Sequence, residues 1–280
     1  MERDAIDAFK TYLIGERRSR YTIRSYISMV REFLEFLGRK EIAVDEEDIE
    51  RYKEFLAVEK GYSKASQRLA LNAVKAFLKS QRKSVPDNLR PPRGSHRVPK
   101  YLTAEEAKAL LEAASGDVKA SAMVSLFLYT GLRVSELCNL NISDVNLREG
   151  IITVRSGKGD KDRIVIMNER CASAVSDYLN MRKAIESKSR ALFLSRKRSR
   201  YDTSSVERII RNLARRAGIE KKVTPHVLRH TFATTMLMNG ADIRFIQQLL
   251  GHSSIATTEI YTHINERALK EMYMKYEPRY

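Results

Sequence analysis

The first third of the chain repeats apolar residues every three or four positions, the spacing that places them on one face of a helix. One run ends at Gly38, a residue typical of helix C-terminal caps, and another begins after Ser63. A further helix is expected from Asp45 to Val58. Together these patterns predict a unit of four helices in residues 1–83, with exposed faces rich in Arg and Lys.

The composition changes at residues 81–100, which hold four of the six prolines and many basic residues. Proline cannot continue a helix, and it biases the preceding residue towards an extended backbone. We therefore interpret residues 84–100 as an extended, basic linker between two domains. A flexible spacer and a segment that follows phosphates are both compatible with this composition.

Residues 101–280 have the pattern of a second, mainly helical domain with a small sheet. Thr103 and Glu106 have the spacing of a capping box, which predicts a helix start. The apolar run 122–129 is typical of a buried helix, and Gly131 interrupts it. Two short β-branched runs, 151–154 and 163–167, flank a glycine-containing turn and predict an antiparallel hairpin. The fold class is thus mainly α with a small antiparallel β-sheet.

The net charge of the chain indicates what kind of partner it binds. Lys and Arg number 51 against 35 Asp and Glu, a formal net charge of +16. Nucleic-acid backbones commonly neutralise such an excess because binding releases condensed counterions, although a solvated surface is the alternative. Two isolated cysteines, Cys138 and Cys171, fit neither a disulfide framework nor a zinc site. Without a secretory signal or a run of roughly 18 apolar residues, a cytoplasmic protein with no membrane partner is expected.

Two cationic side chains stand next to glycines. Arg133 follows the break at Gly131, and Glu136 lies three residues on, within helical reach of the Arg133 side chain. Lys158 lies between two glycines at the tip of the predicted hairpin, where the backbone can approach a ligand closely. A surface ion pair for Arg133 and a solvated turn for Lys158 are the structural alternatives.

Two further segments contain histidines. His226 and Arg229 are three residues apart, so one helix face presents an imidazole beside a guanidinium. His226 and His230 have the i, i+4 spacing of a zinc pair, but Val227 stands where the zinc protease motif has its glutamate. A buried histidine satisfied by its own fold is the remaining alternative.

Near the C-terminus, His252 follows Gly251 at the end of an apolar helix, where a simple helix cap is the alternative. Tyr261 is one of 13 tyrosines, and its spacing alone does not single it out.

Together these segments resemble the tyrosine recombinase (phage integrase) family, and within it the Xer-type site-specific recombinases. Any one motif is short, but five in the family's order and approximate spacing are specific, and the resemblance extends over nearly the whole chain. The matching stretches are Thr130–Leu137, Gly157–Gly159, His226–Thr234, Leu249–His252 and Ile260–His263.

The resemblance implies a helical N-terminal core-binding domain, a linker and an α+β catalytic domain in residues 101–280. It also implies roles for seven residues, without a metal or other cofactor. Tyr261 would be the nucleophile that forms a 3′-phosphotyrosyl intermediate, and Glu136 a supporting acid. The catalytic pocket would consist of Arg133, Lys158, His226, Arg229 and His252. The family also accepts tryptophan at the position of His252.

The resemblance further implies a double-stranded DNA recombination site as partner and the resolution of chromosome or plasmid dimers as the role. The enzyme would form a dimer on one site and a tetramer on two, through a C-terminal helix from Glu259 onward. That helix has an apolar face with Leu269, Met272 and Tyr273, and packing on its own domain is the alternative. Competing functions are a mobile-element integrase, a type IB topoisomerase, an inactive DNA-binding relative and a metal-dependent nuclease.

Overall fold

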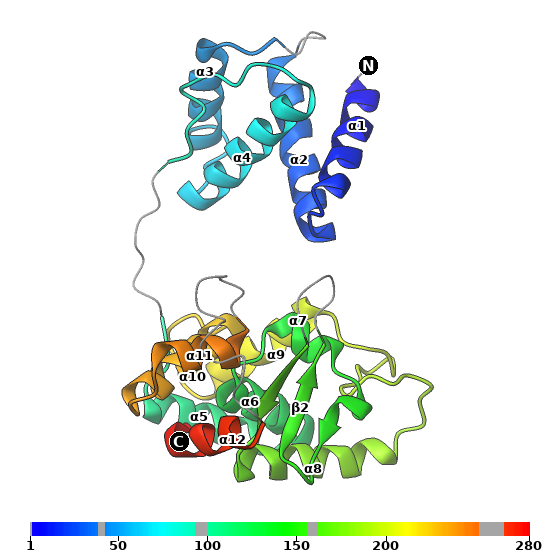
Figure 1. Cartoon of the computed structure of the whole chain (residues 1–280), viewed down its shortest axis with the longest axis vertical. Coiled ribbons are helices and arrows are strands. Elements are labelled where there is room, and N and C mark those ends of the chain that lie inside the picture. Colours follow the sequence, from blue (N-terminus) through cyan, green and yellow to red (C-terminus); the bar gives the residue numbers. More distant parts are fainter. Residues whose placement is uncertain (1, 39–42, 93–99, 156–161, 252–265) are drawn as a thin grey trace. The chain divides into compact units, whose positions relative to one another are not determined.

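A computed structural model provides the structure, and it describes residues 2–38, 43–92, 100–155, 162–251 and 266–280. The chain divides into two compact units, residues 1–97 and 98–280 (Figure 1). Each unit has its own hydrophobic core. The predicted positions Lys158, His252 and Tyr261 lie outside the described residues.

Unit 1 is helical in its described part, as its sequence pattern predicts. Side chains of Ser19, Asp45 and Ser63 accept hydrogen bonds from backbone N–H groups and so start α2, α3 and α4. Gly38 ends α2 with a left-handed backbone, which confirms the predicted cap. The four helices are α1 (Glu2–Gly15), α2 (Arg20–Leu37), α3 (Glu46–Ala57) and α4 (Lys64–Ser80).

Aromatic side chains hold the helices of unit 1 together. Phe9 of α1 meets Phe77 of α4 edge-on, with ring centroids 5.4 Å apart. Phe33 of α2 meets Tyr52 of α3 at 4.8 Å in the same way. All four rings are fully buried. Such edge-to-face pairs add about 0.5–1.5 kcal/mol each beyond their burial, so they help to fix how the helices cross.

The segment interpreted as a linker is partly packed. Leu89 is buried in the core of unit 1. The Asn88 side chain donates to the Glu46 carbonyl at 2.8 Å, and Arg68 of α4 donates to the Pro92 carbonyl at 3.0 Å. Residues 84–92 therefore belong to unit 1, because proline prevents a helix there but not packing of the apolar residues between the prolines.

Unit 2 combines helices with a small sheet, and the described residues confirm the predicted fold class. The described residues contain no helix with the length and apolar character of a membrane span. The elements are α5 (Ala104–Ala114), α6 (Val118–Thr130), α7 (Val134–Asn139), η1 (Ile142–Asp144), β1 (Val145–Asn146), β2 (Ile151–Val154), β3 (Arg163–Ile166), α8 (Glu169–Lys183), α9 (Thr203–Arg216), α10 (Pro225–Met238), α11 (Ile243–Leu250) and α12 (Glu266–Tyr276).

Helix α6 is the centre of unit 2. Every residue from Ala122 to Thr130 is buried, and α5, α8 and α10 pack around the helix. A helix that is apolar on all sides needs such a complete cover. The predicted capping box at Thr103 and the predicted end of α6 at Gly131 are both confirmed. Since α6 is enclosed, the packing around it holds its C-terminal end at Gly131 in place.

The sheet has the order β1-β2-β3 and is antiparallel throughout. The predicted hairpin is confirmed, with Ile152 opposite Val165 and Val154 opposite Arg163. Strand β1 extends the sheet by one short strand that the sequence pattern did not indicate. Its two residues are too few to show an alternating pattern. The turn between β2 and β3, residues 156–161, lies outside the described residues.

The C-terminal helix packs on its own unit in this structure. Leu269 and Tyr273 of α12 are buried, and the Tyr273 hydroxyl donates to the Tyr129 carbonyl at the end of α6, at 2.7 Å. The Tyr280 ring lies 5.6 Å from the Tyr129 ring, and Arg170 donates to the Tyr280 carbonyl oxygen. This arrangement corresponds to the alternative of a helix on its own domain, and docking on a neighbouring protomer stays a prediction.

Candidate active site

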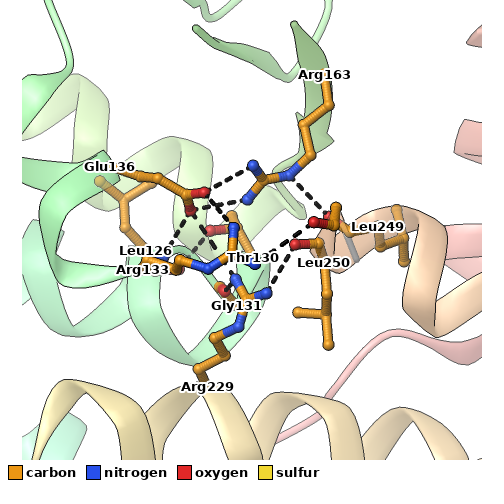
Figure 2. A network of polar contacts seen from close by, with 10 residues as sticks. Leu126, Thr130, Gly131, Arg133, Glu136, Arg163, Arg229, Leu249 and Leu250 are labelled. Atoms are coloured by element: carbon orange, nitrogen blue, oxygen red, sulfur yellow. Dashed lines mark hydrogen bonds and ion pairs between the residues drawn. The ribbon is translucent and has the colours of Figure 1, made fainter. Parts of the chain in front are cut away.

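Four of the seven predicted site residues lie in the described part of unit 2. Arg133 and Glu136 belong to the start of α7, and His226 and Arg229 to α10. Arg133, Glu136 and Arg229 meet in one polar network, which Figure 2 shows from close by. The hypothesis that Arg133 and Arg229 share a pocket therefore agrees with their placement, although they come from distant parts of the sequence.

Glu136 organises the start of α7. Its carboxylate accepts from the Arg133 backbone N–H at 2.7 Å and from Arg133 Nη1 at 2.8 Å. A carboxylate at the N-terminus of a helix satisfies an otherwise unpaired backbone donor. The Arg133 side chain is 44% exposed, whereas that of Glu136 is 13% exposed. Arg133 is thus the arginine of the network that solvent, or a ligand, can reach.

Arg163 is a member of the network that the sequence did not single out. It opens β3 and pairs with Glu136 through two parallel bonds, Nη1 to Oε1 at 2.7 Å and Nη2 to Oε2 at 2.8 Å. Its side chain is only 12% exposed. A single arginine at the start of an apolar strand is commonly solvated. The only sequence signal for Arg163 was therefore a charge beside a buried run.

Arg229 is the most deeply buried arginine of the network. Its Nη1 donates to the Gly131 carbonyl at the end of α6, and its Nη2 donates to the Leu250 carbonyl at the end of α11, both at 2.7 Å. Glu136 Oε2 lies 3.9 Å from Nη1. One guanidinium thus joins the ends of two helices beside the Glu136 carboxylate.

The C-terminal end of α11 receives an arginine at each of three consecutive carbonyls (Figure 2). Arg163 Nε donates to Leu249 at 3.2 Å, Arg229 Nη2 to Leu250 at 2.7 Å, and Arg133 Nη2 to Gly251 at 3.4 Å. The last carbonyls of a helix lack intrahelical partners and carry the negative end of the helix dipole. Cations are therefore favoured here, and they hold the point from which the chain continues to His252.

Two glycines make the close approach of these segments possible. Gly131 and Gly251 both have left-handed backbones, with φ of 65°. A Cβ on Gly131 would lie 2.5 Å from Phe232 Cδ1, and a Cβ on Gly251 would lie 2.9 Å from Arg163 Cδ. Both distances are too short for carbon atoms, so an added side chain at either glycine would force its neighbours to shift.

The network is charged at neutral pH. Burial would raise the pKa of the Glu136 carboxyl, but the hydrogen bonds and charge of Arg163, with the bonds from Arg133, lower the pKa to about 2. Burial, followed by the positive charge of Arg133, lowers the pKa of Arg229 to about 10, although the charge of Glu136 opposes the shift. Glu136 is thus an anion among three cations, and the cluster has an excess of positive charge.

His226 lies in the first turn of α10, one helical turn before Arg229, and its side chain is exposed. Its ring meets that of His230 edge-on, with centroids 4.6 Å apart. Burial, followed by the charges of His226 and Arg229, lowers the pKa of His230. Among the described residues, no group of three or more His, Cys, Asp and Glu side chains has the arrangement of a metal site.

Two family models together match most of the chain. The model of the phage integrase family matches residues 100–268, and that of the phage integrase N-terminal SAM-like domain matches residues 6–83. The match of the first model contains the polar network around Glu136, and that of the second contains α2, α3, α4 and all but the first four residues of α1.

Similar proteins agree with this result. The tyrosine recombinase XerA of Pyrococcus furiosus is 41% identical, over 97% of this chain and 93% of the relative. A crystal structure of XerA recombinase is 56% identical, covers both chains fully and has a TM-score of 0.56. A crystal structure of XerH bound to a palindromic difH substrate, a post-cleavage complex, is 25% identical with a TM-score of 0.68. It covers 89% of this chain and 78% of that one. This chain therefore belongs to the phage integrase family, the family of the Xer tyrosine recombinases.

Proposed function

We propose that this site-specific recombinase cuts and rejoins DNA through a 3′-phosphotyrosyl bond on Tyr261. The observation that carries the proposal is the meeting of Arg133 and Arg229 at Glu136, beside the helix end that leads to His252. The two arginines come from distant segments, and both segments match the family's pattern. A cluster of guanidiniums with a positive excess suits a phosphodiester as ligand.

The proposed pocket has to stabilise the negative charge that develops on the phosphate. Attack on phosphorus increases the negative charge on the non-bridging oxygens, and preorganised cations stabilise this charge. Arg133 is exposed enough to donate to these oxygens directly. Arg229 donates to two carbonyls, and a phosphate oxygen, being an anion, is a stronger acceptor than either. In this proposal guanidiniums supply the charge that metal ions supply in other nucleases.

The proton transfers complete the proposed step. The Tyr261 phenol, with an ordinary pKa near 10, gives its proton to His226 as its oxygen bonds to phosphorus. The bond from phosphorus to the 5′-oxygen breaks, and Lys158 protonates that oxygen. His252 adds a donor to the phosphate. The phosphotyrosyl bond keeps the energy of the broken bond, so the 5′-hydroxyl of another strand can reverse the step without ATP.

The proposed substrate is a duplex with a recombination site, and the proposed role is Xer-type resolution of chromosome or plasmid dimers. The similarity to the P. furiosus XerA, 41% identical over 97% of this chain, supports this role. The XerH relative was crystallised with its difH substrate, which supports a DNA site as partner. We further propose a dimer on one site and a tetramer on two.

The test uses a pool of nicked duplexes of randomised sequence, from which a cleaved strand end diffuses away and traps the covalent adduct. The wild-type chain should form an SDS-stable adduct in EDTA, and mapping of the DNA-linked peptide should give Tyr261. Tyr261→Phe removes only the nucleophilic oxygen, so it should bind the recovered duplexes normally and form no adduct. A wild-type chain without adduct, or a different linked side chain, would contradict the proposal.

A further inference from the structure

Arg163 contacts two of the segments from which the proposed site is built. Its two Nη groups bind both oxygens of Glu136, and its Nε binds the Leu249 carbonyl (Figure 2). All three nitrogens of this guanidinium therefore have partners. A planar fork that binds a carboxylate on one side and a carbonyl on another leaves the side chain little freedom.

A third segment is linked to Arg163 by the backbone. Arg163 opens β3, where it pairs with Val154 of β2 in the strand pair nearest the turn. Lys158 belongs to the turn of this hairpin in the sequence. The turn end of the two strands is therefore tied to Glu136, and through Glu136 to Arg133.

The contact with α11 is also steric. Gly251 packs so closely on the Arg163 side chain that an added Cβ would lie 2.9 Å from Cδ and 3.1 Å from Nε. The chain reaches His252 at the next residue. The Arg163 side chain thus packs against the C-terminal turn of α11 and donates to one of its last carbonyls.

The buried Glu136 carboxylate depends energetically on its ion pair with Arg163. A buried carboxylate is costly unless it is paired, and removal of one partner from a buried pair is strongly destabilising. Without Arg163, Glu136 would keep the bonds from Arg133 but lose two charged donors. It would move towards Arg133, Arg229 or solvent, and the Arg133 guanidinium would move with it.

We propose that Arg163 is a positioning residue that acts through Glu136 to hold Arg133 and the end of α11 in the geometry of the reaction. This inference rests on the proposed function. Arg163 itself is largely buried and bound to protein atoms, so it is not assigned a contact with the DNA. Its loss should slow strand cleavage and leave DNA binding nearly unchanged, because a misplacement of about 1 Å costs on the order of 100-fold in rate.

The experiment compares Arg163→Gln and Arg163→Lys on a nicked duplex recovered from the randomised pool. Arg163→Gln should form the adduct about 100-fold more slowly at saturating DNA. Its dissociation constant for DNA should stay close to that of the wild-type chain. Arg163→Lys keeps the positive charge but lacks the forked guanidinium. Its rate of adduct formation should therefore lie between those of the wild-type chain and Arg163→Gln.

Arg182 provides the matched control. It is also a buried arginine, in the last turn of α8, and its Nη groups donate to the carbonyls of Ile185 and Ser189 in the segment after that helix. Arg182→Gln should lower the thermal midpoint of unfolding, because it removes a buried arginine. It should have no effect on the cleavage rate. If Arg163→Gln does not fold, Arg163→Lys, compared with Arg182→Lys, carries the same test.

A double-mutant cycle tests the route through Glu136. If Arg163 acts through Glu136, the double variant with Glu136→Gln should cleave about as fast as the slower single variant, because coupled residues give non-additive effects. If the rate losses of the two single variants multiply in the double variant, the inference is overturned. A wild-type cleavage rate in folded Arg163→Gln would overturn it as well. An absent adduct in the wild-type chain would instead overturn the proposed function, so the two failures are distinguishable.

Discussion

At the scale of single residues, Glu136 explains how three arginines can lie together. The carboxylate neutralises the charge of only one of these cations. Carbonyls at the ends of α6 and α11 also accept hydrogen bonds from the guanidiniums of Arg229 and Arg163. Three guanidiniums around one carboxylate keep a positive excess in a largely buried place. This excess is unfavourable for folding alone, and it is useful for a ligand that brings negative charge.

The pKa of Glu136 gives a pH dependence with a defined sign. Its carboxyl titrates near 4.3 in an unfolded chain and at about 2 in the folded one, so the unfolded state binds more protons in between. The contribution to stability is complete above the unfolded value and is lost as pH falls towards 2. On the order of 3 kcal/mol is involved. Thermal unfolding followed by circular dichroism at pH 6, 5, 4 and 3 measures it.

Glu136→Gln is the control for this pH effect. It cannot ionise, so it should be less stable than the wild-type chain at pH 6 and approach it in stability as pH falls. A difference between the two chains that stays constant from pH 6 to 3 would show that Glu136 is not the titrating group.

Among the described residues, the sequence predicted the members of the polar network that belong to motifs, and it missed Arg163, which is defined by tertiary contact. Arg133 and Glu136 are neighbours by helical spacing, so their pairing follows from local geometry. The meeting of Arg229 with Glu136 was expected only from the family pattern. Arg163 lies far from Glu136 in sequence, and the pattern of its strand contains nothing that identifies the partner.

At the scale of elements, local signals predicted the helix ends well. Asp45 and Thr103 carry capping boxes and Gly38 and Gly131 have left-handed backbones, all determined by residues within one turn. Packing depends on distant residues, so the sequence did not reveal that residues 84–92 join the core of unit 1. The same reason left open whether α12 covers its own unit or a neighbour.

Among the glycines that the structure describes, Gly131 is predicted to be the most sensitive to alanine. A left-handed backbone costs an alanine about 1 kcal/mol, and the added Cβ would lie 2.5 Å from the Phe232 ring and 2.7 Å from Leu250. The clash should add about 1–3 kcal/mol, the range typical of overpacked cores. Gly131→Ala should therefore lower the thermal midpoint of unfolding clearly. It should also slow adduct formation, because the Gly131 carbonyl is a partner of Arg229.

Gly116 is the matched control for this substitution. It lies in the turn between α5 and α6, its backbone is not left-handed, and nothing lies within 4 Å of an added Cβ. Gly116→Ala should leave both stability and cleavage nearly unchanged or slightly raise the stability, since alanine restricts the unfolded chain. Equal losses in the two variants would refute the role assigned to Gly131.

At the scale of the whole molecule, the charge is distributed between two kinds of environment. Many of the 51 basic residues are exposed on both units, while Arg163 and Arg229 are buried at the site. Salt screens exposed charges strongly and buried pairs much less. Binding of the duplex and cleavage of the strand should therefore respond to salt differently.

Binding should weaken steeply, by about 10³-fold or more between 50 and 200 mM salt if 6–10 phosphates are contacted. The rate of adduct formation at saturating DNA should change little over the same range, because the network around Glu136 is mostly shielded from ions. Fluorescence anisotropy of a labelled duplex with Tyr261→Phe measures the first quantity, and single-turnover trapping with the wild-type chain the second. A cleavage rate that fell in parallel with binding would mean that charges outside the network around Glu136 stabilise the transition state, and the network would lose its assigned role.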